Sequence, residues 1–313
     1  MKAIRIHAYG GPEQMQFEDA PVPTCGTGDL LVRVVAAGVN PIDWKMRSGL
    51  MAEQLPKPFP ITLGSDAAGI VTALGGAVRG FQLGDDVFFY AEFARGGTYA
   101  EYVAVDASQV AKKPRTAPFS TAAALPTPGQ AAWTALIETA RIERGLRVLI
   151  HGGAGALGTI AVQLAKEHGA HVIATASGDG VALVESLGAD EVIDYRTRRF
   201  EQVARDIDIV LDTLGGATQE ASWATMRKGG ILVATAMPPS PERAAAAGVR
   251  AAFVFTAPRG AVLAQLAQRV DDGRLRIVVG QELALADAAQ AHRLGESGKA
   301  RGKMILHVAA PGG

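Results

Sequence analysis

One stretch of this chain has residue types and a spacing that suit the binding of a phosphate-bearing cofactor. Residues 147–158, RVLIHGGAGALG, are an apolar run that ends in a Gly-X-Gly-X-X-Gly turn made by Gly153, Gly155 and Gly158. Glycines there let the backbone turn tightly, approach phosphate oxygens and pack a following helix against the strand. The amides at the start of that helix would face the anion. The spacing therefore predicts a site for a dinucleotide pyrophosphate.

The segments around the turn are those that a nucleotide-binding βαβ unit requires. TIAVQLAKEHG continues with the helical spacing of Ile160 and Leu164 and stops at Gly169, and HVIATAS is typical of the next strand. A lone glycine turn is weak support, but the complete order of strand, turn, helix and strand is much stronger. The alternative is a glycine-rich loop in a βαβ unit that has only a structural role.

The chain divides into a β-rich part and an α/β part. Up to about Val110, short apolar runs such as LLVRVVAAGV, GIVTAL, DVFFY and EYVAV alternate with Gly and Pro. From TAAALPTPGQAAWTAL to GGILVATA, helical and strand patterns alternate, which predicts a doubly wound parallel sheet. The closing KMILHV strand is predicted to join the first part. We therefore predict one domain over residues 1–123 and 269–313, and a second over residues 124–268.

The composition is that of a globular protein with a neutral or small polar ligand. Of the 313 residues 48% are hydrophobic, and 31 Lys and Arg balance 31 Asp and Glu, which gives no reason to expect nucleic acid or a membrane surface. Cys25 is the only cysteine, so an internal disulfide and a multi-thiolate metal site are excluded. No run is long enough to span a bilayer, and the N-terminus lacks a signal-peptide pattern. We expect a cytoplasmic protein.

Several ordered blocks resemble those of one enzyme superfamily. The blocks cover nearly the whole chain: AAGVNPIDWKMRSG, LGSDAAGIV, LGDDVFFY, GGTYAEYVAV, AAALPTPGQAAWTAL, IHGGAGALGTIAVQLAK and RGKMIL. They resemble the medium-chain dehydrogenase/reductase superfamily, and within it the zinc-independent quinone oxidoreductases related to ζ-crystallin and the alkenal and enone reductases. The resemblance implies an α/β fold with a GroES-like β-rich catalytic domain and a Rossmann doubly wound parallel-sheet cofactor domain.

The resemblance also implies that no metal takes part. Where zinc-bearing relatives have a cysteine after Ala-Gly this chain has Asn40, and their Gly-His-Glu block is Gly64-Ser65-Asp66 here. The six histidines are scattered and form no usual ligand set with Cys25, so each is more typical of a surface or packing role. The chemistry is then hydride transfer from a reduced nicotinamide to a quinone or an α,β-unsaturated carbonyl, whose conjugation spreads the developing charge onto oxygen.

The block around Asn40 supplies the predicted catalytic residues. By resemblance, Asn40 lies beside the nicotinamide, where its amide can donate and accept hydrogen bonds. The alternative is that Asn40 only forms the turn before Pro41. Asp43, Trp44 and Arg47 are expected to line the substrate site, with a structural ion pair of Asp43 and Arg47 as the alternative.

Other residues are predicted to hold the cofactor. The turn and the helix after it contribute Gly153, Ala154, Gly155, Ala156, Leu157 and Gly158. The resemblance adds Lys303 as a pyrophosphate contact, with a solvated lysine as the alternative. It also places Thr235 and Phe255 at the boundary of the nicotinamide pocket, with core packing as the alternative for Phe255.

The end of the second strand favours NADPH over NADH. An NAD-preferring unit usually has an acidic side chain there, which would repel a 2′-phosphate, but HVIATAS ends in Ser177. Tyr195 and Arg196 match a block from which NADPH-dependent relatives take contacts. Asp179 and the lack of a lysine after Ser177 count against this assignment. So does Ala131, which replaces a threonine of many relatives.

The sequence thus predicts a zinc-independent, NADPH-dependent reductase of a quinone or enone. Two alternatives stay open: an enoyl-thioester reductase, although no basic patch for a phosphorylated carrier is found in the N-terminal domain, and a low-turnover NADPH-binding protein with a structural or regulatory role. Residues 251–258, AAFVFTAP, resemble the edge strand through which family members form homodimers. An apolar edge strand without a partner favours aggregation, so pairing with a second copy is expected. A nucleic acid or membrane partner is not expected.

Overall fold

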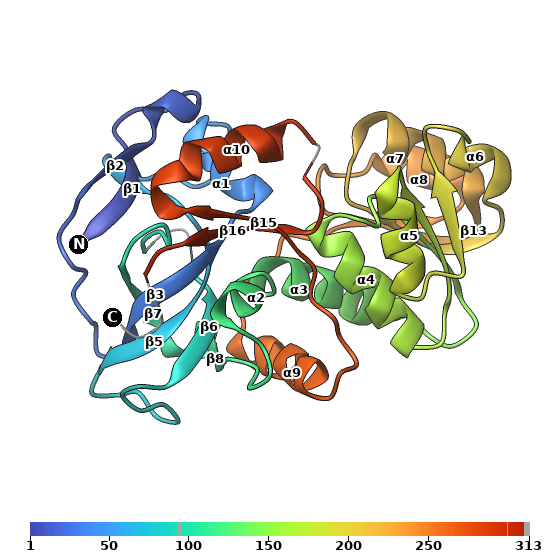
Figure 1. The fold of residues 1–313 in the computed structure, drawn as a ribbon. Coiled ribbons are helices and arrows are strands. Elements are labelled where there is room, and N and C mark those ends of the chain that lie inside the picture. The colour runs from blue at the N-terminus through green and yellow to red at the C-terminus, as the bar shows by residue number, and fades with distance from the viewer. Residues whose placement is uncertain (93–94, 299, 310–313) are drawn as a thin grey trace. The chain divides into compact units, whose positions relative to one another are not determined.

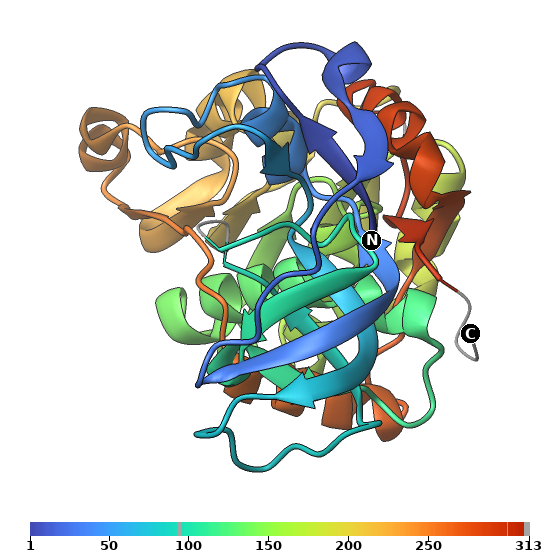
Figure 2. The same cartoon turned by 90° about the vertical axis from the view of Figure 1, so that its left-hand side faces the viewer.

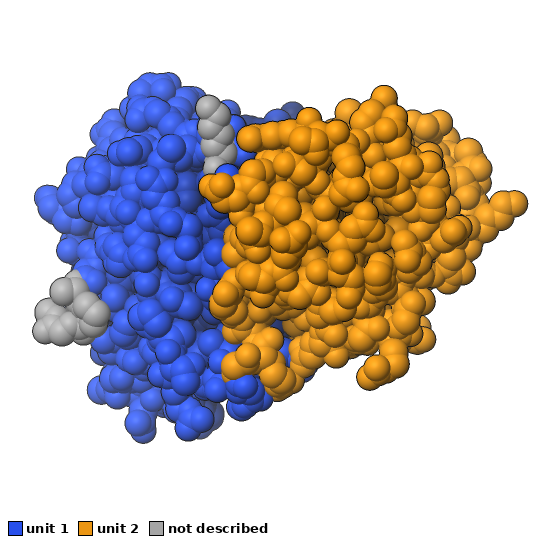
Figure 3. All heavy atoms as spheres, turned by 45° about the vertical axis from the view of Figure 1, so that its right-hand side comes forward, with its two compact units in different colours: residues 1–127, 257–272, 277–313 blue, residues 128–256, 273–276 orange. Residues whose placement is uncertain are grey.

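The structure is a computed structural model that describes all residues except 93–94, 299 and 310–313. It divides into two units, which Figure 3 colours separately. Unit 1 comprises residues 1–127, 257–272 and 277–313, and unit 2 comprises residues 128–256 and 273–276. Residues 310–313, the end of the predicted 269–313 segment, lie outside the described part. No described helix is long and apolar enough to cross a membrane.

Unit 1 is built from apolar strands separated by Gly and Pro turns. Its larger sheet has seven strands in the order β15-β16-β3-β5-β6-β8, with β7 paired to β3, and a second sheet has the order β2-β1-β4. Strands β3 and β5 run antiparallel and side by side in Figure 2. Because side chains alternate between the two faces of a strand, Val32, Val34 and Val71 bury their side chains in one core.

The elements of unit 1 have the following bounds: β1 Lys2–Ile6, η1 Pro12–Gln14, β2 Gln16–Asp19, β3 Asp29–Gly38, α1 Pro41–Arg47, β4 Ile61–Thr62, β5 Asp66–Leu74, β6 Asp86–Tyr90, β7 Tyr102–Asp106, η2 Ala107–Gln109, β8 Val110–Lys112, α2 Phe119–Ala123, α9 Gly260–Asp271, β15 Val279–Ala284, η5 Leu285–Asp287, α10 Ala288–Glu296 and β16 Lys303–His307. The predicted return of KMILHV to the first part is confirmed, because β16 pairs with β3. Figure 1 shows α10 beside α1.

Unit 2 contains the predicted doubly wound parallel sheet. Its strand order is β11-β10-β9-β12-β13-β14, and all neighbours are parallel. The order reverses between β9 and β12, and ligands of such sheets bind at the carboxyl ends of the strands near this point. Its elements are α3 Pro126–Trp133, which begins in unit 1, a π-helix Thr134–Thr139, β9 Arg147–Ile150, α4 Ala156–Glu167, β10 His171–Ala176, α5 Asp179–Ser186, β11 Glu191–Asp194, α6 Phe200–Val203, β12 Ile207–Asp212, α7 Gly216–Ser222, η4 Trp223–Thr225, β13 Met226–Ala234, α8 Pro241–Ala247 and β14 Arg250–Phe253.

Helix α9 differs from the domain boundaries expected from the sequence. Residues 124–268 were expected to form the cofactor domain, but α9 belongs to unit 1. The reason is its contact with β8: a Cβ on Gly260 would overlap the backbone oxygen of Val110, so this glycine lets the helix lie directly on the strand. At the other end of α9, Asp271 accepts hydrogen bonds from the backbone and hydroxyl of Thr116. Contacts distant in sequence therefore decide where α9 packs.

Candidate active site

The predicted cofactor residues of unit 2 all follow the carboxyl ends of its parallel strands. The glycine turn follows β9, Ser177 follows β10, Tyr195 follows β11, Thr235 follows β13, and Phe255 lies two residues after β14. Because these strands are parallel, their carboxyl ends lie along one edge of the sheet. The structure thus places these residues along the edge where such sheets bind dinucleotides.

The glycine turn leaves the N-terminus of α4 open to an anion. No side chain caps this helix, and the amides of its first residues, Ala156, Leu157 and Gly158, have no acceptor within the helix. A Cβ on Gly158 would overlap the carbonyl oxygen of Gly152, so this glycine is required by the packing of helix on turn. A Cβ on Gly155 would lie 3.3 Å from that oxygen, which is a close contact but not an overlap, so the packing constrains Gly155 less than Gly158. The turn fits a pyrophosphate.

Polar side chains gather where a ribose 2′-phosphate would lie. The Ser177 hydroxyl donates to the Tyr195 hydroxyl at 2.8 Å. Tyr195 is 57% exposed, and Arg196 next to it is also exposed. The sequence places no acidic side chain at Ser177, whereas Asp179 begins α5 two residues later. This end of the sheet can therefore offer hydroxyls and a guanidinium to a phosphate.

In unit 1, strand register brings a second set of polar residues together. β3 ends at Gly38, which pairs with Asp66 at the start of β5 and with Ile305 of β16. A Cβ on Gly38 would lie 2.8 Å from Cε of Lys303 and 3.0 Å from Cβ of Asp66. Only glycine lets the beginnings of β5 and β16 approach the end of β3 so closely. Asn40, two residues after β3, therefore meets Asp66 and Lys303.

The amide of Asn40 is held on both sides. Its Nδ2 donates to the Ser65 hydroxyl and to Asp66 Oδ2, both at 2.9 Å, and its Oδ1 accepts from the Lys303 ammonium. The residue is 3% exposed and caps α1. Both Nδ2 hydrogens are thus used within the protein, which corrects the expectation that this amide could also donate to a ligand. One lone pair of Oδ1 remains for an external donor.

Asp66 is the anion at the centre of this cluster. Oδ2 accepts from Asn40 and from Lys303 Nζ at 2.9 Å, and Oδ1 accepts from the Thr127 backbone at 3.0 Å and the Thr127 hydroxyl at 2.5 Å. Asp66 is fully buried. Sequence reasoning considered Ser65 and Asp66 only as lost metal ligands and missed Thr127 altogether. Their place in the Gly-His-Glu block was the available signal for the first two.

Lys303 lies in neither of the environments expected from the sequence. It was assigned to a pyrophosphate or to solvent, but it is 2% exposed and its ammonium binds Asp66 and Asn40. An ammonium in a buried place requires a counter-charge, since desolvation is costly. Asp66 supplies that charge. Lys303 is therefore the cation of the Asn40 cluster in this structure.

Asp43 supports Asn40 from the first turn of α1. Its Oδ2 accepts from the Asn40 backbone at 2.7 Å and its Oδ1 accepts from the Ser65 hydroxyl at 3.0 Å. Burial raises the pKa of Asp43 to about 7, although the hydrogen bonds from Asn40 and Tyr99 act in the opposite direction. Asp43 is 1% exposed, so it orients other groups rather than lining an open substrate site.

Arg47 and Trp44 also point into unit 1. Arg47 is 2% exposed, donates to the Gly10 carbonyl at 3.1 Å and pairs with Glu296 at 2.6 Å. Neither expected role describes it, because it faces no open site and its ionic partner is not Asp43. Trp44 packs edge-on to His292 with ring centres 6.1 Å apart. These two side chains fix α1 against α10.

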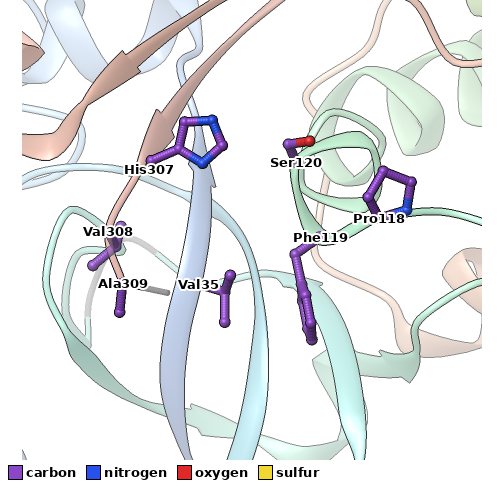
Figure 4. A pocket seen from close by; sticks show the side chains of 7 residues that line it. All are labelled: Val35, Pro118, Phe119, Ser120, His307, Val308 and Ala309. Atoms are coloured by element: carbon purple, nitrogen blue, oxygen red, sulfur yellow. The ribbon is translucent and has the colours of Figure 1, made fainter. Parts of the chain in front are cut away.

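Unit 1 also has a cavity that is separate from the predicted site residues. It has a volume of about 500 Å³, and Figure 4 shows the side chains of α2 on one side and those at the end of β16 on the other. Its lining consists of Val35, Pro118, Phe119, Ser120, His307, Val308 and Ala309. None of the predicted site residues lines it, so we do not assign it to the candidate site.

The described residues do not fit a bound metal ion. Among them, no three His, Cys, Asp or Glu side chains come together as a ligand set. Asn40 and Asp66, at positions that correspond to ligand-bearing blocks of zinc-containing relatives, instead hold the Lys303 ammonium.

Two family models match most of the chain between them. "Alcohol dehydrogenase GroES-like domain" matches residues 26–115 and "Zinc-binding dehydrogenase" matches residues 187–306. The mouse "NAD(P)H oxidoreductase RTN4IP1, mitochondrial" is 32% identical over 98% of this chain and 89% of its own. The Arabidopsis thaliana "NADPH-dependent alkenal/one oxidoreductase, chloroplastic" is 33% identical over 98% of this chain and 79% of its own. The solved quinone oxidoreductase of Coxiella burnetii has 34% identity and a TM-score of 0.92, with 99% of each chain covered.

Together, a GroES-like unit and a Rossmann-type parallel sheet with an open glycine turn define the two-domain dehydrogenase and reductase class. The chain belongs to the medium-chain dehydrogenase/reductase superfamily. The fold that the sequence predicted is confirmed.

Proposed function

We propose that this protein is an NADPH-dependent oxidoreductase that reduces a quinone or an α,β-unsaturated carbonyl without a metal. The observation that carries the proposal is the Asn40 cluster. It stands where zinc-containing relatives have ligand-bearing blocks, and its cation is the Lys303 ammonium. The names of the Arabidopsis relative and the Coxiella structure support the same class of substrate. Conjugated acceptors suit such a site, because they need no metal-bound alkoxide.

In this proposal unit 2 holds the cofactor. The amides of Ala156, Leu157 and Gly158 and the dipole of α4 bind the pyrophosphate. Ser177, Tyr195 and Arg196 bind the 2′-phosphate, and the absence of an acidic side chain at Ser177 removes the repulsion that would favour NADH. When bound, NADPH supplies the hydride. Thr235 and Phe255 lie at the boundary of the nicotinamide pocket, as the resemblance implies.

Unit 1 supplies a rigid polar group for the reaction. As the resemblance implies, Asn40 would orient the nicotinamide, for which one lone pair of Oδ1 remains available, while Lys303 and Asp66 prevent rotation of the Asn40 amide. Because every Nδ2 hydrogen is already used, Asn40 orients the cofactor rather than donating a proton to the substrate. The side-chain geometry is pre-organised, so little ordering is needed upon binding.

The proposal is tested by following cofactor oxidation with a matched panel of an ortho-quinone, a para-quinone and a medium-chain enone. We expect turnover with NADPH that a chelator does not reduce, and a preference over NADH of at least about tenfold, since a phosphate–guanidinium contact is a charge-assisted bond. Arg196→Ala should remove most of that preference and leave NADH turnover unchanged. Tight NADPH binding without turnover would instead support the low-turnover binding protein, and activity on enoyl thioesters alone would support the thioester reductase.

We also propose a homodimer that forms through β14. This strand is the edge of the six-stranded sheet, and Phe253 on it is 41% exposed. Pairing with a second copy would cover an apolar edge that otherwise favours aggregation. Gel filtration with light scattering should give twice the chain mass at micromolar concentration, and Ala252→Pro should shift the protein toward a monomer. A wild-type monomer under these conditions would contradict the proposal. The expected compartment is the cytoplasm.

A further inference from the structure

A line of buried hydrogen bonds links α10 to the first turn of α1 within unit 1. Arg47 pairs with Glu296 at 2.6 Å and contacts His292 Nδ1 at 3.2 Å. The His292 Nε2 lies 3.4 Å from the Tyr99 hydroxyl, which donates to Asp43 Oδ2 at 3.0 Å. Arg47, His292, Tyr99 and Asp43 are each at most 2% exposed, whereas the Glu296 side chain is 34% exposed. The line therefore runs from the surface to the support of Asn40.

The direction of these hydrogen bonds is fixed by chemistry. A guanidinium only donates, so Nδ1 of His292 must accept from Arg47. Burial and the Arg47 charge lower the pKa of His292 to about 3, so the ring is neutral and its hydrogen lies on Nε2. Nε2 then donates to the Tyr99 oxygen, and Tyr99 has its own hydrogen left for Asp43. From Arg47 through His292 and Tyr99, each hydrogen bond is therefore donated in the direction of Asp43, while Arg47 also donates to Glu296 at the surface end.

The ionisation of Asp43 controls the orientation of Ser65 and through it that of Asn40. An unprotonated Asp43 accepts the Ser65 hydrogen, which leaves the Ser65 oxygen free to accept from Asn40 Nδ2. A proton on Asp43 Oδ1 would donate to the Ser65 oxygen. The Ser65 hydrogen would then lose its acceptor on Asp43, and the Ser65 hydroxyl would no longer be fixed in its present orientation beneath Asn40 Nδ2. The amide of Asn40 is thus held best when Asp43 is a carboxylate.

We propose that Tyr99 and His292 are positioning residues: their donated hydrogen bonds keep Asp43 unprotonated and thereby fix the Asn40 amide in the orientation used for hydride transfer. The inference rests on the proposed function in taking Asn40 as the residue that contacts the nicotinamide. It adds a role for two side chains that the sequence marked only as part of a strand block and as a packing histidine.

Other charged and titratable groups also face Asp43. Lys303 from β16 favours the carboxylate, whereas Asp66 from β5 and burial oppose it. Tyr90 at the end of β6 is buried, and its burial together with the charges of Asp66 and Asp43 raises the pKa of its hydroxyl. Lys57 shares with Asp43 the lining of a cavity of about 10 Å³, and burial lowers the pKa of Lys57 to about 8. These groups are unchanged in a Tyr99 variant, so such a variant isolates the Tyr99 hydroxyl.

The test compares Tyr99→Phe with Tyr102→Phe in the full-length protein. Tyr102, three residues along the chain in β7, is partly exposed and is outside the Asn40 cluster. The Asp43 carboxyl is titrated by ¹³C NMR and assigned by the signal that Asp43→Asn removes. Tyr99→Phe should raise the Asp43 midpoint by about one pH unit, the size expected for one hydrogen bond to a carboxylate, and Tyr102→Phe should leave it in place. Equal midpoints in the wild type and Tyr99→Phe would overturn the inference.

The pH profile of kcat/KM provides the second readout. The acid limb of the wild-type profile should shift upward in Tyr99→Phe by the same amount as the NMR midpoint, with a larger effect on kcat than on the KM of the acceptor. His292→Leu should act like Tyr99→Phe, whereas His292→Gln, whose Nε2 can replace the donor, should restore much of the wild-type profile. A shifted NMR midpoint in a protein that reduces no acceptor would overturn the proposed function and support the Tyr99–Asp43 coupling. A shifted NMR midpoint with an unshifted profile would overturn the positioning role.

Discussion

Replacing Lys303 with methionine is expected to lower the free energy of unfolding by about 3–5 kcal/mol, the usual cost of breaking a buried ion pair. The substitution removes the counter-charge of a fully buried Asp66 carboxylate and leaves the Asn40 Oδ1 without its donor. Methionine has a similar length and fills most of the space. The loss is therefore electrostatic, and it should be visible as a lower urea midpoint by circular dichroism.

Lys112→Met is the matched control for this experiment. Lys112 also pairs with an aspartate, Asp85 at 3.3 Å, but its side chain is 61% exposed. An exposed pair typically contributes no more than about 1 kcal/mol. The double variant Lys303→Met with Asp66→Asn should recover part of the lost stability, since it leaves no unpaired charge. A Lys303→Met protein as stable as Lys112→Met would show that Lys303 is not the buried partner of Asp66.

Two glycines of the turn after β9 should respond very differently to alanine. Gly155→Ala is expected to lower the stability by no more than about 1 kcal/mol, because the new Cβ would lie 3.3 Å from the Gly152 oxygen, a close contact rather than an overlap. Its methyl group would still stand at the open N-terminus of α4, where the pyrophosphate approaches the backbone. NADPH binding should therefore weaken at least about tenfold, measured by calorimetric titration.

Gly158→Ala separates packing from binding in the same turn. Its Cβ would overlap the Gly152 carbonyl oxygen and lie 2.7 Å from the Gly153 Cα, and neither backbone atom can move without distorting the turn. Such overpacking should cost about 1–3 kcal/mol of stability. If Gly155→Ala bound NADPH as tightly as the wild type, the pyrophosphate would not be held at this helix.

The parts of the fold that local patterns determine were predictable. The glycine spacing, the helical spacing of Ile160 and Leu164, and the apolar runs of the parallel strands each depend on near neighbours, and they become β9, α4 and β10 as predicted. The residue types that follow the strands also indicated at which edge of the unit 2 sheet the candidate cofactor residues lie. Such local signals do not require knowledge of the tertiary structure.

The interior of the unit 1 site was not predictable from local patterns. The place of Lys303 depends on the register of β16 on β3, and the partner of Arg47 is 249 positions away in the sequence. Both lysine and arginine are usually exposed, so composition favours solvent for each. Long-range pairing buries them instead, and it also turns Tyr99 and His292 into neighbours of Asp43.

The most direct test of the proposed reduction is the fate of deuterium from NADPH that carries deuterium at both hydrogen positions of nicotinamide C4. The protein is incubated with the labelled cofactor, a chelator and each quinone or enone of the panel, and the products are analysed by mass spectrometry and NMR. We predict that an enone product carries one deuterium at its β-carbon. For a quinone, whose hydroquinone hydroxyls exchange with water, we predict that one labelled NADPH is oxidised for each quinone reduced. Oxidation of the cofactor that forms no reduced acceptor, or no oxidation with any acceptor, would contradict the account.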